Sequence, residues 1–399
     1  MCYGAKTYCK RLVESYKQLF GELPQERHAP QEKGDQPELD ETPEMGPSGI
    51  AQYQSLIGAM QWLVTLNRFD IAQAIMSLSR FRTAPRIGHM ERLKQVVGYL
   101  RKRAHFAIRF RTEIPDHEST FGDEPIRYNW METVYGCPQE EIADHFPTPK
   151  GKKVRTTSFC DANLMHDVVT GRSASGILEF LNQTPVDWMS KRQNQVECAT
   201  YGSEFMVARQ ATERIIDLRY TLRSFGVPLD GPSWLFGDNK SVVTSSTIPH
   251  SNLSKRWNAL SYHKVREAIA GGWLRFEHLP GTENPSDILT KSLPWFMLKV
   301  FVEPLLDWKG DTSQIRTGSQ NPEGSITSHG SQDPVTSPSP DLPESGTPSH
   351  GWIETPARGR AVQDPSVRAG HAGHLTVSDP LANNQYFPRK IDEFGRLHG

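Results

Sequence analysis

Apolar residues recur at helical spacing through the first third of the chain, which indicates amphipathic helices. The predicted elements are a helix over 6–20, two helices within 52–82 that separate near 67–70, a helix over 89–104, and a short strand over 106–110. Asp70 stands where it would cap the second of the two middle helices. We therefore expect residues 1–112 to form a small helical unit.

Three stretches lack any hydrophobic period. Residues 22–47 are acidic and proline-rich, so we expect a mobile linker inside the helical unit. Residues 113–151 read as an irregular insertion. Residues 309–399 are dominated by Ser, Pro, Gly, Thr, Asp and Gln, a composition that cannot bury a core and predicts a disordered tail.

The region 152–308 alternates between strand-like and helix-like patterns. Strands are predicted at 154–161, 175–181, 186–190, 233–237 and 273–279, and helices at 204–225, from about 240, at 260–270 and at 284–306. Three strands in succession favour an antiparallel meander, and the later strand–helix alternation favours parallel additions to it. The expected fold class is α/β: a mixed five-stranded sheet with helices on both faces.

Charge is distributed unevenly although the net charge is only −1. Residues 51–115 carry 11 Lys and Arg against 3 Asp and Glu, and residues 151–300 carry 18 against 14. A basic surface around a small acidic pocket suits a polyanionic substrate. The alternative reading is an ordinary solvated surface.

The five cysteines form no CxxC pair, and their odd number argues against a disulfide framework. We expect a reducing, intracellular location, in the cytoplasm or the nucleus. No apolar run approaches about 18 residues, so no transmembrane helix is indicated. The start of the chain lacks the apolar core of a signal peptide.

Four acidic residues stand at the ends of predicted elements. Asp161 ends the first strand of the sheet, Glu204 falls in the first turn of the long helix, Asp238 ends the fourth strand, and Asp287 begins the last helix. Open sheets gather ligands at such positions. Magnesium prefers carboxylate oxygens, and phosphodiester hydrolysis often uses two ions about 4 Å apart. An acid at a helix start is also a common cap, and spacing alone leaves both readings open.

Seven motifs, in order across residues 154–294, resemble the ribonuclease H domain of copia-type retrotransposon polyproteins. They are F-C-D-A at 159–162 (family S-D-A-D), T-G-R-S-A-S-G at 170–176 (R-R-S-T-S-G-Y), V-D-W-M-S-K-R-Q at 186–193 (I-S-W-S-S-K-K-Q), T-Y-G-S-E-F-M-V-A at 200–208 (S-T-E-A-E-Y-M-A), G-D-N-K-S at 237–241 (C-D-N-Q-S), Y-H-K-V-R-E at 262–267 (Y-H-F-I-R-E) and S-D-I-L-T-K-S-L-P at 286–294 (A-D-I-F-T-K-P-L-P). The resemblance implies a ribonuclease H-like fold. It also implies hydrolysis of the RNA strand of an RNA–DNA hybrid with two Mg ions, or Mn in their place.

The resemblance extends upstream, where residues 53–63 are similar to Y-R-S-L-V-G-S-L-M-Y-L and residues 68–72 to R-P-D-I-A. In the family these motifs follow the reverse transcriptase palm, in its thumb-like end. No Tyr-x-Asp-Asp polymerase motif occurs in the chain. We therefore expect a polyprotein fragment without polymerase activity, whose partners are the missing palm, the other polyprotein parts and a nucleic acid, and not a membrane.

The family's roles carry over to the four acids. Asp161 would bridge both ions, Glu204 and Asp238 would hold one, and Asp287 the other. Gly202 replaces the first glutamate of the family's S-T-E-A-E motif, which leaves Glu204 as the catalytic candidate there.

Two histidines and four cations are further candidates. His278 stands where related ribonucleases H place a product-releasing histidine, with a neutral surface histidine as the alternative, and His263 is expected to pack structurally. Candidate phosphate contacts are Lys191, Arg192, Lys255 and Arg256, which could equally be passive surface residues. Trp188 and Trp257 are expected to be core or packing residues, with stacking on bases as the alternative. Residues 256–259 depart from the family's K-H-I-D, which could alter the substrate-facing loop.

Two functions follow from this sequence. The first is a metal-dependent nuclease, favoured by the presence of all four acids. The second is an inactive transposon remnant that binds nucleic acid or protein.

Overall fold

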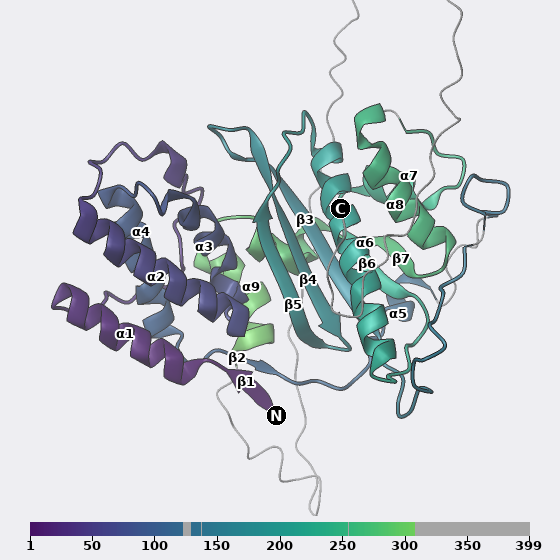
Figure 1. Ribbon diagram of the computed structural model, residues 1–399, viewed down its shortest axis with the longest axis horizontal. Coiled ribbons are helices and arrows are strands. Elements are labelled where there is room, and N and C mark those ends of the chain that lie inside the picture. The colour runs from purple at the N-terminus through teal and green to yellow at the C-terminus, as the bar shows by residue number, and fades with distance from the viewer. Residues whose placement is uncertain (123–128, 137, 254, 308–399) are drawn as a thin grey trace, which may run out of the picture. The chain divides into compact units, whose positions relative to one another are not determined.

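The computed structural model describes residues 1–122, 129–136, 138–253 and 255–307 (Figure 1). The predicted tail, 309–399, and Trp308 lie outside the described residues. In the part of the chain that is described, no helix is both long enough and apolar enough to cross a bilayer.

The first part of the chain contains the predicted helices (Figure 1). They are α1 (Lys6–Phe20), α2 (Pro47–Leu66), α3 (Ala72–Leu78) and α4 (Ile87–Lys102). Strand β1 (Cys2–Gly4) pairs antiparallel with β2 (Ala107–Arg109) and joins the two ends of this unit. Buried apolar side chains such as Tyr53, Leu63 and Leu93 form its core.

The position of Asp70 predicts that it caps α3, but in the structure it does not. Its carboxylate accepts hydrogen bonds from Arg68 Nε (2.9 Å) and Nη2 (2.7 Å), and Tyr99 Oη donates a third (2.8 Å). Arg68 is fully buried, so the ion pair lies inside the helical unit. A buried charge needs such a partner, and this need outweighs the capping preference.

The acidic stretch 22–47, expected to be mobile, is instead bonded to α4. Arg92 donates to Asp35 Oδ1 (2.8 Å) and Asp40 Oδ2 (2.5 Å), and the His89 ring contacts the Pro37 carbonyl (Nε2–O 2.8 Å). Arg101 Nη1 donates to the Pro24 carbonyl at 2.7 Å. Charge-assisted hydrogen bonds therefore order a segment that has little apolar surface to bury.

The predicted mixed five-stranded sheet is confirmed. Its strands are β3 (Thr156–Asp167), β4 (Arg172–Leu181), β5 (Thr184–Arg192), β6 (Ser233–Gly237) and β7 (Leu274–His278). The order is β5-β4-β3-β6-β7, with β3, β4 and β5 antiparallel and with β6 and β7 parallel to β3. The first strand is longer than predicted because its pairing with β4 continues to Asp167 and Arg172.

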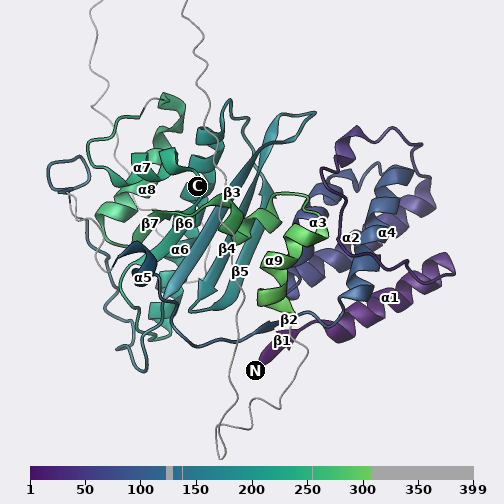
Figure 2. The same ribbon diagram turned by 180° about the vertical axis from the view of Figure 1, so that it is seen from behind.

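Helices cover both faces of the sheet. On one face α6 (Thr200–Ser224), α7 (Lys240–Thr247) and α8 (Ala259–Ala270) share a core with Cys160, Ile177 and Leu235. On the other side of the sheet, α9 (Trp295–Leu306) lies between the strands and the helical unit (Figure 2). Both α9 and the helical unit share a core with Leu178 and Phe180.

The predicted last helix, 284–306, is two elements. A 3-10 helix, η6 (Pro285–Leu289), comes first, and α9 begins only after Pro294. Proline lacks the N–H needed in a helix interior and disfavours helical backbone at the preceding residue, so the helix restarts there.

The predicted insertion, 113–151, packs on the sheet domain. Its described residues contain little regular structure beyond the short helix α5 (Glu118–Phe121). The Glu140 carboxylate accepts from Arg219 Nη2 of α6 (2.8 Å), and Tyr135 Oη accepts from Arg266 Nε of α8 (3.1 Å). Hydrogen bonds and ion pairs to α6 and α8 thus hold this segment in place, although its sequence has no hydrophobic period.

Candidate metal centre

Asp161 lies inside β3 and not at its end, which corrects our prediction. Parallel pairing of β3 with β6 stops at Cys160 and Gly237, whereas antiparallel pairing with β4 continues and places Asp161 opposite Gly176. The sheet therefore opens on one side of Asp161, whose side chain is buried. This is the edge of the parallel part of the sheet, where ligands gather in open α/β sheets.

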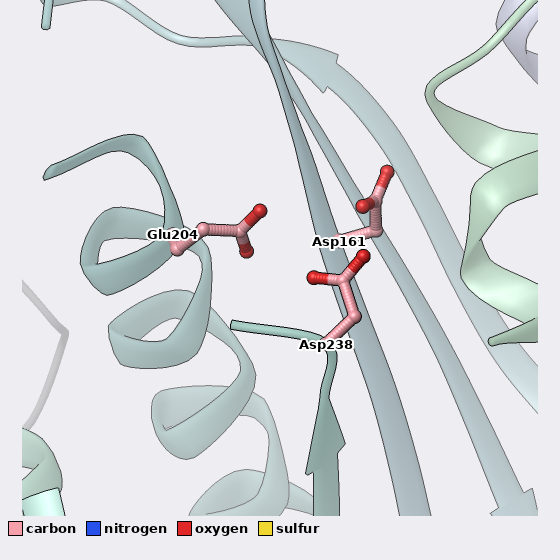
Figure 3. Close-up of side chains that lie close together, drawn as sticks. All are labelled: Asp161, Glu204 and Asp238. Atoms are coloured by element: carbon pink, nitrogen blue, oxygen red, sulfur yellow. The ribbon is translucent and has the colours of Figure 1, made fainter. Parts of the chain in front are cut away.

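Two further carboxylates converge on Asp161 (Figure 3). Asp238 follows β6 directly, and Glu204 projects from α6. One oxygen of each of the three carboxylates lies within 4.8 Å of the others. Because α6 begins at Thr200, Glu204 lies beyond the first turn that we predicted, and it points into the sheet domain instead of capping the helix.

The three acids make an environment that favours a cation. Burial raises the pKa of Glu204 well above its usual value, and the nearby Asp161 and Asp238 raise it further. Burial also raises the pKa of Asp238, with Asp161 as the next cause. Three clustered carboxylate oxygens are the hard ligands that Mg²⁺ or Mn²⁺ takes. The residues present therefore fit a divalent metal.

Asp287 lies next to this cluster with a lysine between. It belongs to η6, and Lys291 Nζ lies 2.7 Å from Asp287 Oδ1 and 3.2 Å from Asp161 Oδ1. Burial raises the pKa of Asp287 to about 6, with Asp161 as the next cause, while Lys291 opposes the shift. Burial disfavours the charged form of Lys291, but Asp161 and Asp287 outweigh it and raise its pKa.

The 3-10 helix η6 is held against β3 by three residues that the sequence did not single out as part of the site. Thr290 Oγ1 donates to Asp161 Oδ2, and Asn284 Nδ2 donates to the Cys160 carbonyl at 2.9 Å. Lys291 completes the set. The spacing of four residues between Asp287 and Lys291, inside one motif, was the available signal for an ion pair.

Gly202, the departure from the family motif, faces Glu197. A Cβ at position 202 would lie 2.1 Å from Glu197 Oε2 and 3.0 Å from Asn258 Nδ2. Glu197 is buried although it lies in the loop before α6. The carboxylate of Glu197 thus occupies the space that a side chain at 202 would fill.

The two candidate histidines differ in position. His278 ends β7, and its Nε2 lies 3.1 Å from the Asp238 carbonyl oxygen, so it lies beside the acidic cluster. His263 is exposed on α8, and its Nδ1 lies 2.5 Å from Tyr135 Oη, so it contacts the 113–151 insertion.

The four candidate phosphate contacts also divide. Lys191 and Arg256 are exposed, and Lys255 Nζ lies 6.0 Å from the Trp257 ring centre. Arg192 Nη1 donates to Asp167 Oδ2 at 2.6 Å, so its charge is already paired.

The two tryptophans differ as well. Trp188 packs against Phe69 and donates from Nε1 to the Val64 carbonyl (2.8 Å), as expected of a packing residue. Trp257 is 65% exposed, which corrects our expectation. It belongs to the short 3-10 turn Arg256–Asn258, which leads into α8.

Comparison with solved structures returns ribonucleases H. The ribonuclease H1 of the halophilic archaeon Halobacterium salinarum NRC-1 matches 34% of this chain and 94% of its own, with 18% identity and a TM-score of 0.27. LC11-RNase H1 in complex with an RNA/DNA hybrid matches 34% of this chain and 94% of its own, with 13% identity and a TM-score of 0.28.

No protein-family model matches the chain. Among curated proteins, the retrovirus-related Pol polyprotein from transposon RE2 of Arabidopsis thaliana is 23% identical over 61% of this chain and 14% of its own length. The corresponding polyprotein from transposon TNT 1-94 of Nicotiana tabacum is 24% identical over 63% of this chain and 16% of its own. Secreted RxLR effector protein 161 of Plasmopara viticola is 25% identical over 43% of this chain and 94% of its own.

The chain thus spans about one seventh of the length of the two polyproteins that it matches. Its homologues over about three fifths of its own length are retrovirus-related Pol polyproteins of copia-type transposons, which confirms the resemblance predicted from its motifs.

Proposed function

We propose that this chain is a metal-dependent endonuclease that hydrolyses the RNA strand of RNA–DNA hybrids, as the ribonuclease H part of a retrotransposon polyprotein. The observation that carries the proposal is the convergence of Asp161, Glu204 and Asp238 within 4.8 Å at the open edge of the sheet. Two Mg²⁺ ions are the proposed cofactors, with Mn²⁺ as a substitute.

The carboxylates would hold these ions from rigid supports. Asp161 is fixed by β3, Glu204 by α6, and Asp238 by the end of β6, so their oxygens are arranged before substrate arrives. Asp287 would contribute from η6. When bound, the metal ions lower the pKa of a water and stabilise charge on the phosphodiester oxygens.

Other residues would orient the nucleic acid. Lys255 and Arg256 stand beside the exposed Trp257, which offers a ring face and positive charge together. His278, beside Asp238, would assist release of the cut strand. Selectivity for the hybrid would come from contacts with the 2′-hydroxyls in the wide minor groove. Arg192 is not included, because Asp167 already pairs with it.

An inactive remnant that binds nucleic acid or protein is the alternative. One observation favours it: the matched segment makes up 94% of a relative whose name describes a secreted effector and not a polyprotein. A binding module would not need its carboxylates to hold a metal, so the two functions separate in a cleavage assay.

The deciding experiment incubates the full chain and Mg²⁺ with a hybrid labelled on its RNA strand, beside matched RNA–RNA and DNA–DNA duplexes. We expect cleavage of RNA in the hybrid alone. Asp161→Asn and Glu204→Gln should abolish it, whereas Glu213→Gln, an exposed glutamate on the same helix, should leave it unchanged. Binding without cleavage would support the remnant, and cleavage that persists in Asp161→Asn would exclude the proposed site.

A further inference from the structure

We propose that the Lys291 ammonium is a built-in cation of the acidic site, which leaves one ion bound tightly at Asp161, Glu204 and Asp238. A second ion, on the side of Asp287, then binds only by displacing the lysine. This inference rests on the proposed function, because it concerns the same carboxylates.

The position of Lys291 carries the inference. Its Nζ bridges two carboxylates from different elements, Asp161 of β3 (3.2 Å) and Asp287 of η6 (2.7 Å). The side chains of these partners are only 1% and 13% exposed, whereas that of Lys291 is 34% exposed. The ammonium therefore lies where a second ion shared by Asp161 and Asp287 would have to bind.

Both oxygens of Asp161 are already engaged on this side. Lys291 contacts Oδ1, and Thr290 Oγ1 donates to Oδ2. Asp161 is the residue that two ions would share. A second ion must therefore compete with these contacts, whereas the first ion also has an oxygen from Glu204 and one from Asp238, each within 4.8 Å of an Asp161 oxygen.

The backbone of η6 holds Lys291 in place. Lys291 N donates to the Asp287 carbonyl at 2.9 Å, and the buried Thr290 N donates to the same carbonyl at 3.2 Å. Asn284 ties the start of η6 to the Cys160 carbonyl (2.9 Å), next to Asp161. The backbone of Lys291 is thus a fixed part of the site. When a second ion displaces the lysine, only the lysine side chain moves.

The balance of charge agrees with displacement of the lysine by a second ion. The four carboxylates, when ionised, carry four negative charges, and one divalent ion with Lys291 supplies three positive charges. A second divalent ion beside a retained lysine would bring the total to five positive charges within a few ångströms, where like charges repel strongly. Displacement of the lysine restores the balance of four against four.

Counting of bound Mn²⁺ tests the inference without any substrate. Electron paramagnetic resonance of free Mn²⁺ would be recorded on the full chain, on Lys291→Met and on Lys240→Met. Lys240 is exposed two residues after Asp238, so its substitution removes one nearby charge without removing the bridge. We expect one tight ion in the wild type and in Lys240→Met, and a second ion in Lys291→Met bound at least about tenfold more tightly than in the wild type.

The wild-type titration decides the matter even if Lys291→Met is unstable. Two ions of equal affinity in the wild type would overturn the inference and leave the proposed function intact. The inference would also be overturned if Lys291→Met left the affinity for the second Mn²⁺ ion unchanged. It would equally be overturned if Lys240→Met raised that affinity as much as Lys291→Met does. No bound ion in any of the three proteins would overturn the metal-dependent function itself.

Discussion

Gly176 lies directly opposite Asp161 in the β3–β4 pair, and its missing side chain lets η6 approach the sheet. A Cβ there would lie 2.7 Å from Thr290 Cγ2 and 2.9 Å from the Ser286 carbonyl oxygen. The backbone that carries Asp287 and Lys291 is therefore in contact with β4, the strand that pairs with β3 at Asp161. The acidic site depends on this close approach as much as on its carboxylates.

Gly176→Ala should push η6 away from the strand. We expect a loss of about 1–3 kcal/mol in the free energy of unfolding, typical of overpacking. We also expect weaker binding of the first Mn²⁺ ion, because Asp161 loses the hydrogen bond from Thr290 that orients its carboxylate. Urea denaturation and metal titration would measure the two effects. Gly58→Ala is the control: among the described residues no neighbour lies within 4 Å of a Cβ there, and the substitution should stabilise α2 by about 1 kcal/mol.

Asp167→Asn should loosen the contact between the helical unit and the sheet. The buried Asp167 carboxylate accepts from Arg80 Nη2 and Arg192 Nη1, both at 2.6 Å, so its loss leaves two cations without their partner. We expect a loss of about 3 kcal/mol in unfolding free energy near neutral pH. Thermal and urea unfolding would measure it, and an unchanged stability would contradict this role.

The same carboxylate gives a pH dependence. Burial opposes its charged form, but hydrogen bonds from Thr170 and Arg192 outweigh burial and lower the pKa of Asp167 from 3.8 to about 2. A folded-state pKa below the unfolded value means that this stabilisation is present above about pH 4 and is lost as the pH falls through about 2. The free energy of unfolding should therefore fall less steeply between about pH 4 and pH 2 in Asp167→Asn than in the wild type, as urea denaturation at each pH would measure.

Glu179 should destabilise the protein as the pH rises. Burial raises its pKa from 4.5 to about 7, with Arg214 opposing, and Glu179 Oε1 has no hydrogen-bond partner among the described residues. The folded state then holds the proton more tightly than the unfolded state, so stability falls between about pH 4.5 and pH 7. Glu179→Gln should remove about 3 kcal/mol of this fall, measured by urea denaturation at pH 5 and pH 8. An equal slope in both proteins would exclude Glu179 as its source.

Trp257 and Arg256 should contribute to binding of the hybrid. With Asp161→Asn as background to prevent cutting, Trp257→Ala should weaken binding about tenfold, as expected for the loss of one stacked base. Arg256→Ala should reduce the salt dependence by about one phosphate contact. Fluorescence anisotropy at several salt concentrations would measure both. Trp62→Ala, also exposed but on α2, is the control and should change neither.

Much of the sheet was predictable because its signals are local. Apolar runs bounded by turn residues marked each strand, and their succession gave the antiparallel and parallel halves. The end of β3 was not predictable from residue 161, because polar residues after it remain paired through backbone hydrogen bonds to β4. Backbone pairing does not require apolar side chains.

The acidic site was predictable only in its ligands. Asp161, Glu204 and Asp238 were found from their places at the ends of predicted elements, and the structure brings them together although Asp161 lies inside β3. The intervening lysine was missed because an ammonium beside two carboxylates looks, in a sequence, like any exposed helical ion pair. The order of residues 22–47 was missed for a similar reason: its partners on α4 are more than 40 residues away.

The contact between the helical unit and the sheet has a consequence for how this chain can be divided into stable pieces. Trp188 of β5 is bonded to α2, and Leu178 and Phe180 of β4 share their core with side chains from the first 108 residues. A cut near residue 152, where the motifs begin, would leave these aromatic and aliphatic groups facing water and prone to aggregate. A piece of this chain that contains the folded sheet would therefore have to start well upstream of residue 154, where the recognisable motifs begin.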